Sequence, residues 1–101
     1  MTEGKRRKIW SKYGGHCAYC GCPLKYREMT VDHLKPKSRK GSGKTTNLMP
    51  ACQRCNTAKG ADGLEMLRIT LVWTSLTPGD LQTFDSVRRK ARRYKLYFER
   101  V

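Results

Sequence analysis

The sequence predicts a small α+β domain in which two short strands lie between helical segments. Residues 27–34 and 47–51 have the composition of strands, whereas residues 3–13 and the C-terminal third show the apolar spacing of helices. Two Cys-x-x-Cys pairs flank the strand segments, and such pairs commonly hold a structural metal in a chain as short as 101 residues. These observations together predict helices around a strand pair that a metal site holds in place.

The N-terminal part of the chain is predicted to be a basic helix followed by a tight turn. The helix covers residues 3–13, and Gly14 and Gly15 end it as a C-cap. Residues 16–23 contain the first cysteine pair together with glycine and proline. We therefore expect a knuckle there, the usual form of half a zinc site.

Two strands are predicted on either side of a basic loop. In residues 27–34, alternation places His33 on one strand face and Asp32 on the other, and residues 47–51 form a brief second strand. The loop between them, residues 35–46, carries five basic side chains and no acidic one. We expect this loop to contact phosphate, and a mobile, solvated loop is the alternative.

The remainder of the chain is predicted to be helical. A short helix over residues 52–60 ends at Gly60, and another covers about residues 63–70. Thr77 is the predicted N-cap of a long amphipathic helix that ends near residue 99. The apolar stripe of this helix is assigned to core packing, and its other face is basic.

The two cysteine pairs are the strongest single signal. Cys17 and Cys20 form the first pair, and Cys52 and Cys55 form the second. Two-residue spacing lets both thiolates of a pair reach one ion, and four thiolates complete a tetrahedral Zn²⁺ site. We predict a structural zinc site, and four unrelated buried cysteines are the alternative. Cys22 is expected to be a bystander in the knuckle.

The charge of the chain predicts a polyanionic partner. Lys and Arg number 22 against 8 Asp and Glu, which gives a net charge of +14 at pH 7. A field of this sign attracts nucleic acid, although a merely solvated basic surface is the alternative. No apolar stretch approaches the ~20 residues of a membrane span. An odd cysteine count and no signal-peptide pattern lead us to expect an intracellular, cytoplasmic protein in a reducing compartment, with no membrane partner.

Three segments of the chain resemble the HNH endonuclease family. They are HCAYCG at 16–21, TVDHLKPKSRKG at 30–41 and TTNLMPACQRCNTAKG at 45–60. The family fold is the ββα-metal motif, or His-Me finger, a hairpin plus a helix around one catalytic divalent ion. The resemblance implies such a core stapled by the four-cysteine zinc site, with flanking N-terminal and C-terminal helices. It also implies one nuclease domain over residues 1–101, with its core at about 7–60 and a helical extension at about 63–101.

The resemblance assigns a chemical role to several residues. His33 is implied to be the general base that activates water, a task suited to histidine because its ordinary pKa is ~6.5. A buried core histidine is the alternative. Asp32 and Asn56 are implied to be ligands of a catalytic Mg²⁺ or Mn²⁺ ion. Because Asn56 stands where many members have histidine, the chain is an HNN variant.

Further residues are implied to position the site or to bind nucleic acid. Asn47 ties the hairpin loop together and so aims His33, and an ordinary Asx-turn is the alternative. Lys59 meets the scissile phosphate and, from the loop, Arg39 does so too, although a solvated charge is the alternative for Arg39. The other candidate contacts to nucleic acid are Lys35, Lys37 and Lys40 in the loop and Arg89, Arg92 and Arg93 in the C-terminal helix.

The activity implied by the resemblance is hydrolysis of a phosphodiester bond in DNA, with double-stranded DNA expected. His33 activates water in line with the leaving 3′ oxygen, with one catalytic ion, so the products carry 5′-phosphate ends. Small stand-alone domains of this family occur in phage and mobile-element proteins, which suggests a nickase that works with phage packaging proteins. The alternatives are a noncatalytic zinc-stabilised module that binds nucleic acid, and an adaptor whose residues 64–101 dock on a protein partner.

Overall fold

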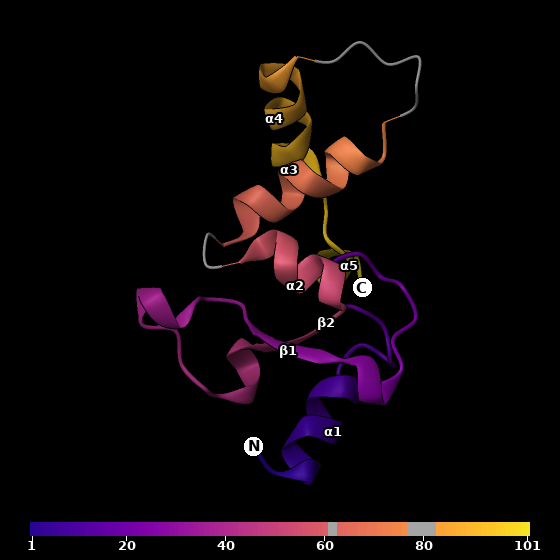
Figure 1. The fold of residues 1–101 in the computed structure, drawn as a ribbon, viewed down its shortest axis with the longest axis vertical. Helices are drawn as coiled ribbons and strands as arrows, with labels where there is room; N and C mark the ends of the chain where they lie inside the picture. The colour runs from indigo at the N-terminus through magenta and orange to yellow at the C-terminus, as the bar shows by residue number, and fades with distance from the viewer. Residues whose placement is uncertain (61–62, 77–82) are drawn as a thin grey trace.

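A computed structural model of the chain describes residues 1–60, 63–76 and 83–101, which form helices and a two-stranded sheet (Figure 1). The helices are α1 (Glu3–Ser11), α2 (Gln53–Lys59), α3 (Leu64–Thr74), α4 (Phe84–Arg93) and α5 (Tyr97–Arg100). The strands are β1 (Thr30–His33) and β2 (Leu48–Ala51), and single 3₁₀ turns are η1 (Tyr26–Glu28), η2 (Lys37–Arg39) and η3 (Thr45–Asn47). The predicted α+β class is confirmed. No helix within the described ranges is long and apolar enough to cross a membrane.

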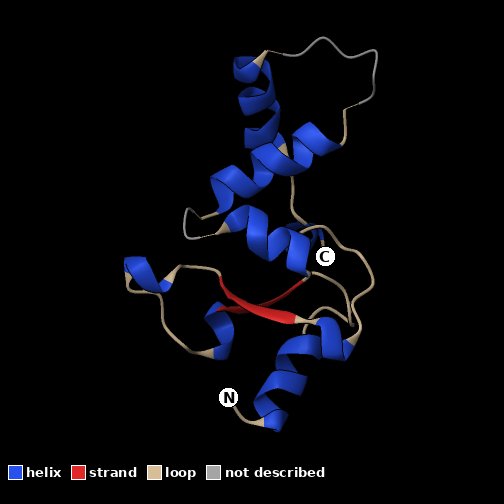
Figure 2. Cartoon of the chain, viewed as in Figure 1, coloured by secondary structure: helices blue, strands red, loops and turns tan. Residues whose placement is uncertain are grey.

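The two strands form an antiparallel hairpin between α1 and α2 (Figure 2). Thr30 lies opposite Ala51, and His33 lies opposite Leu48. Pro50 has no amide hydrogen, but its carbonyl accepts a hydrogen bond of 2.9 Å from the backbone nitrogen of Ala18. The hairpin is therefore tied to the knuckle that carries the first cysteine pair.

The first strand is shorter than predicted because its expected start is a 3₁₀ turn. In η1 the backbone nitrogen of Met29 bonds to the carbonyl of Tyr26, which turns the chain before it enters β1. The first helix likewise ends at Ser11, before the predicted glycines. The short helix after β2 agrees with its prediction: Cys52 is the N-cap of α2, and Gly60 follows its last residue with φ of 52°.

Among the described residues, three groups of buried side chains form the core. One group joins the knuckle, the hairpin, α2, α3 and the segment before α5, and includes Tyr19, Met49, Leu67 and Leu96. A second lies between α1 and the hairpin and consists of Ile9, Leu24, Met29 and Leu48. A third lies between α3 and α4 and consists of Ile69, Val72, Val87 and Ala91. The α3 helix thus links the sheet region to α4.

The prediction of one long C-terminal helix is wrong. Its predicted N-cap, Thr77, lies outside the described residues, and α4 has Thr83 as its N-cap and ends at Arg93. Leu96 is fully buried, and the backbone nitrogens of Tyr97 and Phe98 donate to knuckle carbonyls at 3.0 and 2.8 Å. A straight continuation of α4 would not bring these groups to the knuckle. The helix therefore ends at Arg93, and the chain forms the separate helix α5.

The helix predicted for about residues 63–70 continues to Thr74. Its buried side chains are Leu67, Ile69, Leu71 and Val72, so they face both the first core group and α4. Burial on two sides obscures the amphipathic pattern, which explains why the sequence predicts this helix only to about residue 70.

Candidate functional site

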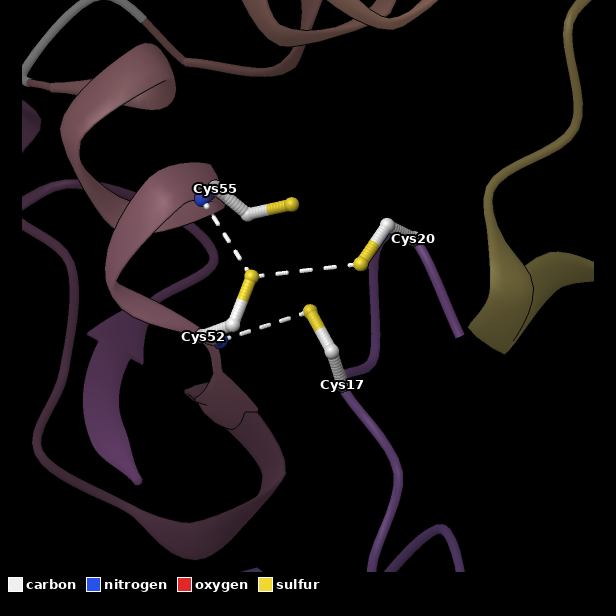
Figure 3. A group of neighbouring side chains, drawn as sticks. All are labelled: Cys17, Cys20, Cys52 and Cys55. Atoms are coloured by element: carbon white, nitrogen blue, oxygen red, sulfur yellow. Dashed lines mark hydrogen bonds between the residues drawn. The ribbon is translucent and has the colours of Figure 1, made fainter. Parts of the chain in front are cut away.

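The four paired cysteines meet in one cluster (Figure 3). Cys17 and Cys20 come from the knuckle, whereas Cys52 and Cys55 come from the start of α2. Their four Sγ atoms all lie within 4.8 Å of one another, and those of Cys20 and Cys52 are 3.9 Å apart. Four sulfurs around a tetrahedral zinc with bonds of ~2.3 Å lie about 3.8 Å apart. The cluster therefore fits a zinc ion, as predicted.

The thiols of this cluster share hydrogen bonds that shift their pKa values in opposite directions. Bonds to Cys17 and Cys55 hold the pKa of Cys20 well below its ordinary value. The bond to Cys20 raises the pKa of Cys17, and the bond to Cys17 raises the pKa of Cys55. Zinc binding requires thiolates, so loading the cluster releases protons and is favoured as the pH rises.

Cys22 does not belong to the cluster of four. Burial raises the pKa of its thiol to about 12, so the side chain remains a neutral thiol near pH 7. Its carbonyl accepts a hydrogen bond of 2.9 Å from the backbone nitrogen of Cys17. This contact closes the knuckle turn through the backbone, which agrees with the predicted bystander role of the side chain.

A second feature is a cleft of about 410 Å³ beside β1 and α2. Four residues predicted for catalysis or for the catalytic ion line it: Asp32, His33, Asn56 and Lys59. The first two end β1, and the last two are one helical turn apart on α2. Lys37 and Ser38 of the basic loop line the same cleft. The hairpin and α2 thus bring together residues that are more than 20 positions apart in the sequence.

Asp32 lies at the inner wall of this cleft with only one oxygen free. It is 7% exposed, and its Oδ2 accepts a hydrogen bond of 2.5 Å from the Tyr19 hydroxyl and lies 3.0 Å from Nζ of Lys59. No described residue bonds to Oδ1, and no buried side-chain oxygen of the described residues lacks a partner. Oδ1 is therefore accessible, and such a carboxylate oxygen suits a hard divalent cation.

Tyr19 is a site residue that the sequence analysis missed. It lies inside the first Cys-x-x-Cys pair and is fully buried. Burial and the hydrogen bond to Asp32 raise the pKa of its hydroxyl, so it stays protonated as a donor. The only signal in the sequence is a tyrosine between two cysteines, which does not reveal that the hydroxyl points at β1.

Lys59 is predicted to contact the scissile phosphate, but in the structure its side chain is buried. Its side chain is 1% exposed, and its ammonium donates to the carbonyl of His33 at 2.8 Å besides its pairing with Asp32. A buried charge requires such partners, because water cannot reach it. The helical spacing correctly placed Lys59 on the face of Asn56, but this face packs on β1.

Asn47 ties both ends of the basic loop together. Its Oδ1 accepts from the backbone nitrogen of Lys35 at 2.8 Å, and its Nδ2 donates to the carbonyls of Lys35 and Ser42 at 3.2 and 2.7 Å. Its own carbonyl accepts from the backbone nitrogen of Leu34, the residue after His33. These contacts span 12 residues of sequence and exceed an ordinary Asx-turn.

The predicted basic residues fall on two separate surfaces. The loop residues Lys35, Lys37, Arg39 and Lys40 are exposed, and Lys37 lines the cleft. The α4 residues Arg89, Arg92 and Arg93 are also exposed, but α4 packs on α3, away from the hairpin (Figure 1). A hollow of about 550 Å³ between α3 and the C-terminal segment includes Arg92 and contains no residue predicted for catalysis.

Comparisons with known proteins agree with this arrangement. The family model described as HNH endonuclease matches residues 17–62, which span the knuckle, the hairpin and α2. The chain is 44% identical over 67 residues, 58% of its length, to the CRISPR-associated endonuclease Cas9 of Corynebacterium diphtheriae, and spans 6% of that protein. A crystal structure of the Type II-C Cas9 enzyme from Actinomyces naeslundii is similar in fold, with a TM-score of 0.57 and 19% identity, over 95% of this chain and 12% of that one.

Proposed function

We propose that the chain hydrolyses phosphodiester bonds of DNA in the cleft beside β1 and α2, because residues 17–62 match the family model described as HNH endonuclease. The observation that carries this proposal is the meeting of Asp32, His33 and Asn56 in one cleft within the matched segment. A carboxylate oxygen, an imidazole and an amide oxygen in one cleft provide the metal ligands and the general base that phosphodiester hydrolysis needs.

The residues of the cleft fit a hard divalent ion. The accessible Oδ1 of Asp32 and the side-chain oxygen of Asn56 would hold Mg²⁺ or Mn²⁺, which when bound supplies positive charge that stabilises the phosphate during hydrolysis. The cysteine cluster is a different site, because four thiolates select a softer metal such as zinc. Two metals with separate roles are therefore proposed.

The chain's own residues would perform the proton transfer and hold the substrate. The imidazole of His33 takes a proton from the attacking water, and the 3′ oxygen leaves, so the products carry 5′-phosphate and 3′-hydroxyl ends. Asn47 fixes the loop directly after His33 and so limits movement of the base. Lys37, which lines the cleft, and the exposed Arg39 of the same loop attract the phosphate backbone.

One such cleft cuts one strand at a time, which supports a nicking activity for a single chain. Cooperation with phage packaging proteins remains a proposal, and a relative that part of the chain matches is instead named a CRISPR-associated endonuclease. We further propose that residues 1–101 form one nuclease domain, supported by the burial of Leu67 and Leu96 in the same core group as Tyr19.

Supercoiled plasmid incubated with the zinc-loaded protein and Mg²⁺ or Mn²⁺ tests the proposal. We expect conversion to the open circular form and 5′-phosphate ends, detected by ligation of the nick. Binding of the same plasmid without any cleavage, under every divalent ion tried, would favour the noncatalytic nucleic-acid module instead. Parallel assays with single-stranded DNA and RNA establish which nucleic acid is preferred.

A further inference from the structure

Tyr19 connects the cysteine cluster directly to the cleft. It stands between Cys17 and Cys20 in the knuckle, yet its hydroxyl reaches Oδ2 of Asp32 at 2.5 Å. The ring is fully buried and packs edge-on against Phe98, with the ring centroids 6.1 Å apart. A single side chain therefore belongs to the turn that carries half of the zinc site and also contacts the proposed ligand of the catalytic ion.

Lys59 approaches the same oxygen from the other half of the cysteine cluster. It ends α2, the helix that Cys52 caps and that contains Cys55, and its Nζ lies 3.0 Å from Oδ2 of Asp32. Two donors, one from each cysteine-bearing element, thus converge on one carboxylate oxygen. The other oxygen, Oδ1, has no donor among the described residues and is the one left to the cleft.

We infer that Tyr19 is a positioning residue for the catalytic ion: its hydroxyl fixes the Asp32 carboxylate so that Oδ1 is presented to the cleft. The inference rests on the proposed function, because it takes Asp32 as a ligand of that ion. The torsion that turns a carboxylate plane is soft, so hydrogen bonds must set its orientation. Outer-shell partners of this kind change metal affinity or activity by about 10- to 100-fold when they are removed.

The role of the Tyr19 hydroxyl can be tested separately from that of the Tyr19 ring. Phenylalanine fills the same space against Phe98 and keeps the core intact, so Tyr19→Phe removes only the bond to Asp32. Tyr13→Phe is the matched control. Tyr13 packs on the same core group, but its hydroxyl contacts Sδ of Met49 at 3.8 Å and makes no bond to Asp32.

The test measures Mn²⁺ binding to zinc-loaded protein through the broadening of the His33 imidazole resonances, which needs no turnover. For Tyr19→Phe we expect the half-broadening Mn²⁺ concentration to rise about 10-fold or more. The zinc content and the unfolding temperature should match those of Tyr13→Phe, and added Mn²⁺ should restore the cleavage rate. Tyr13→Phe should bind Mn²⁺ like the wild type.

The variant Asp32→Asn separates the two ways in which the inference can fail. If Asp32→Asn loses Mn²⁺ binding while Tyr19→Phe binds like the wild type, the role of Tyr19 is wrong and the proposed ion site stands. If Asp32→Asn binds Mn²⁺ normally, the proposed ion site itself is wrong. Loss of zinc or of the folded state in Tyr19→Phe would show that the hydroxyl is structural, which also overturns the inference.

Discussion

The ammonium of Lys59 lies 3.0 Å from Oδ2 of Asp32, and the two side chains are 1% and 9% exposed. A charged lysine therefore occupies the inner side of the carboxylate whose outer oxygen faces the cleft. The ammonium also donates to the carbonyl of His33, the last residue of β1. This pair fixes α2 to β1 and so determines the relative position of Asp32, His33 and Asn56.

Replacing Lys59 should destabilise the fold. In Lys59→Met the buried Asp32 carboxylate loses its counter-charge, and breaking a buried pair in this way costs about 3–5 kcal/mol. Urea denaturation of the zinc-loaded protein measures the change in the free energy of unfolding. Lys90→Met is the control, because Lys90 is exposed on α4, and it should change the free energy by no more than about 0.5 kcal/mol. Equal stability of the two variants would contradict the structural role of the pair.

Purified protein should contain one zinc ion per chain and lose its fold when a chelator removes it. The cluster of four cysteines offers one tetrahedral site, and structural zinc contributes ~10 kcal/mol or more to small metal-dependent folds. Elemental analysis should show loss of zinc in Cys17→Ser and in Cys52→Ser. In Cys22→Ser the zinc content should stay unchanged, and a loss there would place Cys22 among the ligands.

The stability of the folded protein should fall at acid pH, in part because Glu99 becomes protonated. Two contacts of 2.5 and 2.9 Å from the Arg68 guanidinium hold the pKa of Glu99 below its ordinary value of 4.5. Because the folded pKa is the lower one, this stabilisation is complete above about pH 4.5 to 5 and disappears as the pH falls through the folded pKa. The unfolding temperature of the wild type should therefore exceed that of Glu99→Gln at pH 6, and the difference should shrink toward pH 3. A difference that grows in acid would reverse the assigned sign.

The two basic surfaces should differ in their effect on DNA. Replacing Lys35, Lys37 and Lys40 with alanine should slow cleavage and weaken binding, because these exposed residues belong to the loop whose Lys37 lines the cleft. Replacing Arg89, Arg92 and Arg93 should weaken binding without changing the cleavage rate at saturating DNA. In both variants the salt dependence of binding should flatten by about 0.9 per lost phosphate contact. An unchanged salt slope in the α4 variant would show that α4 does not face DNA.

Much of the site could be predicted because its chemistry is local in the sequence. The two cysteine pairs, the Asp-His step at the end of a strand and the helix that ends at Gly60 each depend on spacing within a few residues. The positions of Tyr19 and Lys59 could not be predicted in this way, since the carboxylate that receives both side chains is 13 and 27 residues distant. The break after α4 depends on the burial of Leu96 against the knuckle, which helical periodicity does not report.

The most direct test of the central claim compares His33→Ala with Asn56→Ala in plasmid cleavage over a range of Mn²⁺ concentrations. If His33 is the general base, its removal should lower the cleavage rate about 10²- to 10⁴-fold at every Mn²⁺ concentration, with zinc content and DNA affinity like the wild type. Asn56→Ala should recover in part as Mn²⁺ rises, because it weakens only the hold on the ion. Cleavage by His33→Ala at the wild-type rate would contradict the account and show that His33 is not the base.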